Sequence, residues 1–311
     1  MAADITPIAV LLMAYGGPGK LADVEPYLMD VRGGRATKPQ LVEEIRTRYA
    51  RIGGGSPILG HTRAQAAGVG RVLGKGFRTY VGMRHWHPYI KDTVDEIRRG
   101  GHDRLVGVVM APHYSSMSVG AYEKKLLDAI AGEPPIETAL VRSWWDNPSF
   151  LDAVAQNVTQ ALQRFPRPKD VQVVFTAHSL PQKILAAGDP YTVEFGNSCE
   201  AVARRLRLPD WHVAYQSAGA TADPWLGPAA ADVITDLARA GSDSVLLVPI
   251  GFVCDHVEIL YDIDIEYQAL AKRVGVLIER TDSLNDSPGL IAVVADVLRH
   301  AELRDSRLRG S

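Results

Sequence analysis

The sequence predicts an α/β protein in which parallel β-sheets are covered by helices on both faces. Short runs rich in Val, Leu and Ile alternate with amphipathic stretches along the 311 residues. Strands buried on both faces read as continuous apolar runs, and the helices between them provide the crossovers that parallel strands require. A weak internal repeat also indicates two similar halves.

The apolar runs and the helical periodicity place the individual elements. We expect strands at residues 8–14, 77–82, 104–111, 137–142, 171–177, 212–216, 244–250 and 274–278. We expect helices at residues 39–50, 62–73, 90–99, 149–164, 193–207, 228–240 and 287–302. The chain should therefore divide into an N-terminal half (1–145), a C-terminal half (146–285) and a final helix with a tail (286–311).

Two offsets describe the repeat. A shift of 140 places residues 92–108 on 232–248, with five of the 17 positions identical. A shift of 163 places residues 10–18 on 173–181 and sets Tyr15 opposite His178. Duplication explains both offsets, and the general likeness of strand–turn–helix starts explains the second one equally well.

The first half carries an insertion, because the two offsets differ by 23 residues. It contains "VRGGR" and "RYARIGGGSP", in which arginines stand among glycine-rich turns. Guanidinium forks and backbone N–H groups suit anionic ligands. A solvated surface loop would have the same composition.

Composition excludes several classes of function. A formal net charge of -2 gives no support for bulk binding to nucleic acid or to anionic lipid. The first apolar run lacks the basic flank of a signal peptide, and no run is long enough for a spanning helix. Two cysteines are too few for a disulfide framework. The expected location is the cytoplasm.

Polar rings follow several of the predicted strands. The stretch "FTAHSLP" ends a buried strand on His178 just before the chain must turn, and Tyr15 and His113 follow strands in the same way. Ligands of open parallel sheets bind beyond the carboxyl ends of the strands. A lone histidine there often only caps a turn, but several polar groups together favour a binding cleft.

An acidic row follows the strand expected at 244–250. Glu258, Asp262 and Glu266 are spaced four residues apart, so on an α-helix they would form one stripe. Like charges at this spacing repel, which argues against a purely stabilising role. The row suits a divalent cation or a proton path, or else a solvated helix face.

Eight motifs occur in order along the chain: "LLMAYGGP", "RYARIGGGSPI", "GMRHWHPYI", "FTAHSLP", "GDPY", "AYQSA", "WLGP" and "PIGFVCDHVEILYDIDIEY". With them the chain resembles the ferrochelatase family over nearly its whole length, and most closely the bacterial coproporphyrin III type. The resemblance implies two similar Rossmann-like halves with a porphyrin cleft between them. It also implies insertion of Fe²⁺ as two protons leave.

The resemblance assigns catalytic roles to three residues. His178 matches the catalytic histidine, a proton acceptor and metal-site ligand whose ordinary pKa near 6.5 suits a base. Glu258 matches its partner glutamate. Tyr15 is the residue that the coproporphyrin type carries, and we count it with the catalytic set. Asp262 and Glu266 would extend the metal path.

Other residues match positions that contact the porphyrin. Arg32, Arg48 and Ser56 match propionate-contacting positions, and we add Tyr122 to this substrate-binding set. Fe²⁺ is then a substrate, and no cofactor is required. Two cysteines cannot provide the four thiolates of a [2Fe–2S] cluster.

The expected partners follow from the same resemblance. They are the porphyrin substrate and the pathway enzymes before and after this step, coproporphyrinogen oxidase and coproheme decarboxylase. We expect a monomer that binds no nucleic acid and has no transmembrane segment. The alternatives are a protoporphyrin IX ferrochelatase, a cobalt-inserting chelatase, a non-catalytic tetrapyrrole carrier and a nucleotide-dependent enzyme.

Overall fold

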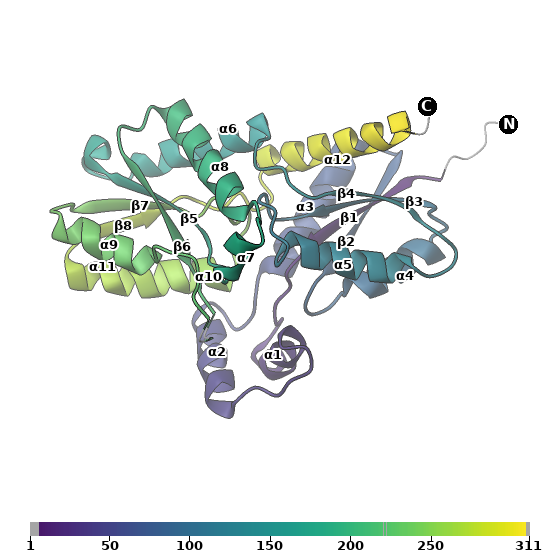
Figure 1. The fold of residues 1–311 in the computed structure, drawn as a ribbon, viewed down its shortest axis with the longest axis horizontal. Coiled ribbons are helices and arrows are strands. Elements are labelled where there is room, and N and C mark those ends of the chain that lie inside the picture. Colours follow the sequence, from purple (N-terminus) through teal and green to yellow (C-terminus); the bar gives the residue numbers. More distant parts are fainter. Residues whose placement is uncertain (1–5, 220, 222, 309–311) are drawn as a thin grey trace. The chain divides into compact units, whose positions relative to one another are not determined.

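The computed structural model describes residues 6–219, 221 and 223–308, with the side chains of 302–308 left aside. The chain forms two compact units (Figure 1). The first contains the chain up to Ala111, Ser118–Trp144 and the segment from Asn285 onward. The second contains Pro112–Met117 and Trp145–Leu284.

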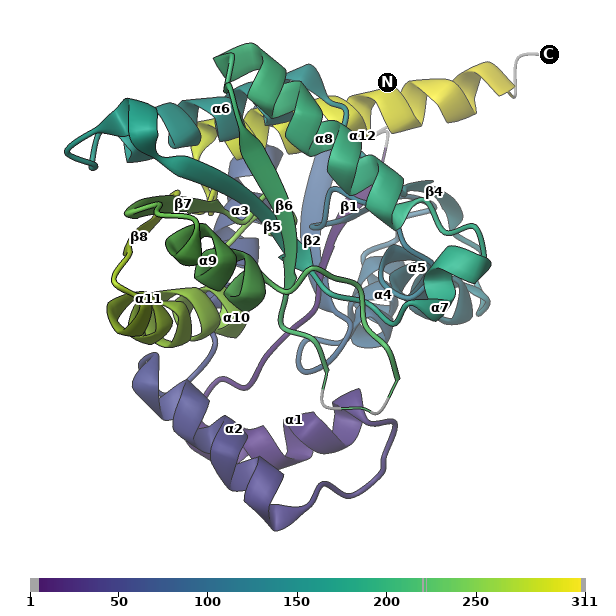
Figure 2. The same ribbon diagram turned by 60° about the vertical axis from the view of Figure 1, so that its left-hand side comes forward.

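The first unit is built on a four-stranded parallel sheet of order β2-β1-β3-β4. Its strands are β1 (Ile8–Ala14), β2 (Phe77–Met83), β3 (Arg104–Val109) and β4 (Glu137–Val141). Because β1 is central and covered on both faces, all seven of its residues are buried. Helices cover both faces of this sheet (Figure 2). One face carries α3 (Ile58–Leu73) and α12 (Pro288–Leu308), and the other carries α4 (Ile90–Arg99) and α5 (Val119–Ile130).

The second unit repeats this plan with a parallel sheet of order β6-β5-β7-β8. Its strands are β5 (Gln172–His178), β6 (Trp211–Gln216), β7 (Ser244–Val248) and β8 (Leu277–Arg280). Its longer helices are α6 (Pro148–Leu162), α8 (Tyr191–Leu206), α9 (Ala230–Arg239) and α11 (Gln268–Val274). Two short helices, α7 (Lys183–Ala186) and α10 (Val257–Leu260), follow the ends of β5 and β7.

The internal repeat is confirmed in detail. The two sheets have the same strand order, and α9 lies 140 residues after α4 at both of its ends. The backbone also repeats a hydrogen bond: Met83 N–H donates to Pro88 O at 2.7 Å, and Tyr215 N–H donates to Pro228 O at 2.9 Å. The two prolines are again 140 residues apart, and the two donors lie in the corresponding strands β2 and β6.

The insertion consists of two helices in the first unit. After a 3₁₀ turn at Leu21–Asp23, the chain forms α1 (Val24–Val31) and α2 (Pro39–Arg51) before α3 begins. The figures draw α1 and α2 side by side, outside the helix layers of the sheet (Figures 1 and 2).

Some expected elements differ from the structure. The strand expected at 274–278 begins only at Leu277, because Gly275 adopts a left-handed conformation (φ 77°) that ends α11. Helices α1, α5, α7 and α11 were not among the expected helix ranges. Helix α12, which forms the described part of the final segment expected at 286–311, packs on α3 where Gly68 leaves room for Ile291.

We expected the acidic row to lie on a regular α-helix, and this prediction is wrong. Asp262–Tyr267 forms a π-helix between α10 and α11, in which Glu266 N–H donates to Tyr261 O at 3.0 Å. Such π-turns are rare and occur often at functional sites. Across the part of the chain that the structure describes, no helix is long and apolar enough to cross a membrane.

Candidate active site

His178 ends the central strand β5, as its sequence context predicts. The phenol of Tyr191 donates to the His178 carbonyl at 2.8 Å, and Ser179 N–H donates to Gln216 O at 2.8 Å. The His178 Nδ1 atom contacts the Ser179 carbonyl. Because a carbonyl only accepts, Nδ1 carries a hydrogen, and Nε2 is left to face Glu258.

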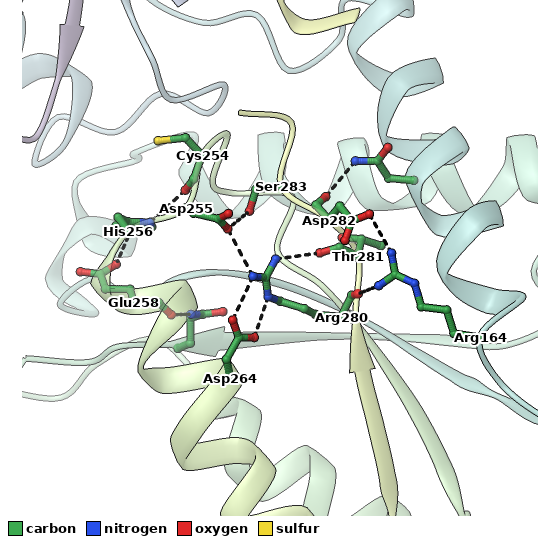
Figure 3. Close-up of polar contacts among 12 residues, drawn as sticks. Arg164, Cys254, Asp255, His256, Glu258, Asp264, Arg280, Thr281, Asp282 and Ser283 are labelled. Carbon is green, nitrogen blue, oxygen red and sulfur yellow. Dashed lines mark hydrogen bonds and ion pairs between the residues drawn. The ribbon is translucent and has the colours of Figure 1, made fainter. Parts of the chain in front are cut away.

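Glu258 in α10 lies between two imidazoles. Its Oε1 is 3.4 Å from His178 Nε2, and its Oε2 is 3.5 Å from His256 Nε2. His256 Nδ1 lies 3.1 Å from the Cys254 carbonyl, so its Nε2 also points to the carboxylate (Figure 3). The Gln216 amide donates to the Glu258 carbonyl at 2.8 Å and fixes this backbone position.

The contact between His178 and Glu258 changes the pKa values of both. Burial alone would lower the pKa of His178, but the Glu258 carboxylate, the Ser179 carbonyl and the charge of Asp262 raise it to about 9. Burial would raise the pKa of Glu258, but the two imidazoles hold it well below its usual range. At neutral pH the pair is therefore imidazolium and carboxylate, whereas the sequence argument assumed a neutral imidazole.

Asp262 and Glu266 have different environments. Asp262 is 6% exposed, and the hydroxyl of Ser217 donates to its Oδ2 at 2.5 Å. Glu266 is exposed. Among the described residues, no three or more His, Cys, Asp or Glu side chains are arranged to hold a metal ion. Asp262 is thus a buried carboxylate and Glu266 an exposed one. The role of the row in a metal path stays a prediction.

Tyr15 directly follows the central strand of the first unit and is 38% exposed. Its ring lies 4.9 Å from the ring of His85, and the Arg84 guanidinium lies 5.7 Å above it. The same guanidinium lies 5.4 Å from the ring of Tyr122, which is buried. Arg84 therefore links Tyr15 and Tyr122, and it lies in the motif "GMRHWHPYI", to which no role was given.

The turn after Tyr15 needs glycine. Gly16 has φ 92°, and a side chain there would place its Cβ 1.7 Å from the carbonyl of His85. His85 N–H donates to Tyr15 O at 2.8 Å, and its Nδ1 lies 2.6 Å from Asp30 Oδ2. Burial lowers the pKa of His85 although Asp30 opposes this. The imidazole thus connects the Tyr15 turn to helix α1.

The proposed propionate contacts lie in or beside the insertion. Arg32 follows α1 and is exposed, and Arg48 in the last turn of α2 pairs with Glu44 at 3.0 Å. Ser56 N–H donates to Pro18 O at 2.8 Å, which ties the end of the insertion to the loop that follows Tyr15. Ser56 is therefore held against the loop that follows Tyr15. Arg32 and Arg48 lie at the C-terminal ends of the inserted helices α1 and α2.

Sequence reasoning missed several polar groups that support the site. Gln216 and Tyr191 contact the backbone of Glu258 and His178, and they lie in the motifs "AYQSA" and "GDPY", to which no role was given. Arg280 at the end of β8 was missed as well. Gln216 ends β6 and Arg280 ends β8, so a polar residue at the end of these two strands was the available signal.

The architecture matches that of known chelatases. The sirohydrochlorin chelatase SirB from Bacillus subtilis subspecies spizizenii, solved in complex with cobalt, aligns with a TM-score of 0.58 at 11% identity. The alignment covers 96% of this chain and 97% of that one. At this identity the likeness concerns the fold. The shared fold consists of parallel sheets covered by helices.

Sequence comparison narrows the class further. The ferrochelatase family model matches residues 7–302. A ferrochelatase of Herpetosiphon aurantiacus is 43% identical over 93% of this chain and 97% of its own length. A coproporphyrin III ferrochelatase of Bacillus pumilus is 35% identical over 94% of this chain and 96% of its own. The chain belongs to the ferrochelatase family.

Proposed function

We propose that this enzyme inserts Fe²⁺ into coproporphyrin III and yields coproheme III and two protons. The exposed Tyr15 ring beside the Arg84 guanidinium carries the proposal. Coproporphyrin III has four propionates where protoporphyrin IX has two, and a guanidinium beside a phenol offers charge-assisted hydrogen bonds to a carboxylate. The Bacillus pumilus relative, named a coproporphyrin III ferrochelatase, supports the same substrate.

In this proposal the His178–Glu258–His256 chain receives the pyrrole protons. Imidazole and carboxylate alternate at 3.4 and 3.5 Å, which allows a proton to pass along the chain as the contacts shorten. His178 holds its own proton up to about pH 9, so this proton has to leave before the imidazole accepts another. The dication supplies the driving force, because its charge disfavours a protonated imidazole nearby.

Arg32, Arg48 and Ser56 are assigned to the propionates, and Tyr122 supports Arg84 from below the surface. Fe²⁺ is a substrate in this scheme, and no resident cofactor takes part. We further propose that the enzyme acts as a cytoplasmic monomer. Coproporphyrinogen oxidase would act before it, and coproheme decarboxylase after it.

The test is steady-state insertion of Fe²⁺ into coproporphyrin III and protoporphyrin IX side by side. We expect the higher kcat/KM with coproporphyrin III. Arg84→Met should raise the KM for coproporphyrin III more than the KM for protoporphyrin IX, because it removes one carboxylate partner. Equal or higher kcat/KM with protoporphyrin IX in the unmodified enzyme would assign the enzyme to the other substrate.

A further inference from the structure

Arg280 at the end of β8 makes an unusually complete set of contacts. Its Nε and Nη2 atoms donate to the two carboxylate oxygens of Asp264 at 2.7 and 2.9 Å. Nη2 also lies 3.3 Å from Asp255 Oδ1, and Nη1 donates to the Thr281 carbonyl at 3.1 Å (Figure 3). Only 17% of the side chain is exposed, so these contacts are partly shielded from water.

The two aspartates lie on either side of Glu258 in the chain. Asp255 immediately precedes His256, and Asp264 lies in the π-helix that follows α10. One guanidinium therefore fixes both ends of the segment 255–264, and β8 anchors it through its pairing with β7. Ser283 adds to this by donating to Asp255 Oδ1 at 2.7 Å.

The geometry requires arginine in particular. The planar fork matches both oxygens of Asp264 at once, whereas a lysine ammonium would act as a single point charge. Its positive charge also offsets the repulsion among Asp255, Glu258 and Asp264, which lie within ten residues of one another.

We propose that Arg280 is a positioning residue for metal insertion: it holds the loop before α10 and the π-helix after it, and so keeps Glu258 directed at His178. The inference rests on the proposed role of Glu258. Arg280 itself need not touch porphyrin or metal. Its loss should therefore lower the rate of insertion and leave porphyrin affinity unchanged.

The experiment compares Arg280→Met, Arg280→Lys and Asp264→Asn in Fe²⁺ insertion into coproporphyrin III. Arg280→Met should lower kcat by about 10- to 100-fold, as loss of groups that orient metal-site ligands does, with KM for the porphyrin within about twofold. Arg280→Lys should recover part of kcat. The double variant of Arg280→Met with Asp264→Asn should be no slower than Arg280→Met, because both break the same contact.

Arg164→Met is the matched control. Arg164 pairs with Asp282 at 2.7 Å and donates to the Arg280 backbone carbonyl at 3.2 Å, so it supports the same strand end but contacts neither Asp255 nor Asp264 (Figure 3). Its loss should leave kcat unchanged. Hydrogen–deuterium exchange gives a readout without activity: Arg280→Met should speed exchange in residues 255–267 and spare β7.

The outcomes separate the two hypotheses. If the unmodified enzyme inserts Fe²⁺ into neither porphyrin, the proposed function fails, and the exchange data still decide the inference. Unchanged kcat and unchanged exchange in Arg280→Met would refute the positioning role. Equal losses of kcat in Arg280→Met and Arg164→Met would reduce Arg280 to a general structural contact.

Discussion

Glu258→Gln tests the electrostatic description of the site most directly. The substitution keeps the size and shape of the side chain, removes its charge and replaces one acceptor oxygen by an NH₂ donor. Without that charge, burial should determine the protonation of His178, and its pKa should fall from about 9 to near or below the ordinary 6.5. His178 should then be neutral at pH 7.5 in the variant.

The magnitude follows from the size of the pKa shift. A change from 6.5 to about 9 corresponds to roughly 3 kcal/mol, and screening at a side chain that is 34% exposed reduces this to about 1–2 kcal/mol. Since the pKa of His178 is raised, its contribution is complete below pH 6.5 and is lost as the pH rises through 9. Since the pKa of Glu258 is lowered, its contribution is complete above pH 4.5 and is lost in more acidic solution.

The two signs together define the expected stability profile. Glu258→Gln should lower the free energy of unfolding by about 1–2 kcal/mol near pH 6, and by little near pH 10. Urea unfolding at both pH values measures this difference. Glu266→Gln is the matched control, because it removes an exposed carboxylate from the same region and should show no such pH dependence.

An NMR titration of the histidine ring resonances gives the pKa of His178 itself. The His178→Ala variant identifies the signals of this residue. A pKa of 6.5 or lower in the unmodified enzyme would refute the raised value. A stability difference that is the same at pH 6 and pH 10 would show that Glu258 acts through packing and not through its charge.

Four further predictions concern activity. His178→Ala should abolish metal insertion while the fold and porphyrin binding persist, and retention of most of kcat would move the proton acceptor elsewhere. Arg48→Ala should weaken porphyrin binding by about 1.5–3 kcal/mol, the range for a hydrogen bond to a charged group, and an unchanged Kd would place Arg48 outside the site. Asp262→Asn or Glu266→Gln should raise the KM for Fe²⁺ more than that for porphyrin, and a soaked divalent cation that leaves no density near them would contradict the metal path. Tyr15→Phe should slow insertion in steady-state assays without the loss expected for His178→Ala, and an equally severe loss would give the phenol a larger role.

The sequence predicted most of the fold because the fold depends on local pattern. Buried strands and amphipathic helices leave a periodicity, and the 140-residue offset predicted the match of α4 with α9. The positions of His178 and Tyr15 at the ends of central strands were also predictable, because each lies where the first strand of a half ends. The type of helix predicted for the acidic row was wrong. A single π-helical turn, with i→i+5 hydrogen bonds, is too short to change the periodicity of the apolar residues around it.

The supporting contacts were not predictable from the sequence, because each joins residues far apart in the chain. Arg84 and Tyr15 are separated by the two inserted helices and by α3 and β2, and Arg280 reaches back to Asp255 across α10, the π-helix and α11. Such pairs depend on register and on rotamers. Charge alone did not distinguish Arg280 from the exposed arginines of the same unit.

The raised pKa of His178 alters the view of this residue as a simple base. An imidazole with an ordinary pKa would be largely neutral at pH 7 and ready to accept a pyrrole proton before any metal arrives. Here Glu258 raises the pKa of His178 to about 9, and in the proposed mechanism the imidazole keeps its proton until another positive charge comes close. In the proposed mechanism that charge is Fe²⁺, so the proton acceptor is released only when there is a metal to insert. The site would then couple proton removal to metal arrival, and kcat/KM for Fe²⁺ should rise with pH toward about 9, where His178 loses its proton without help.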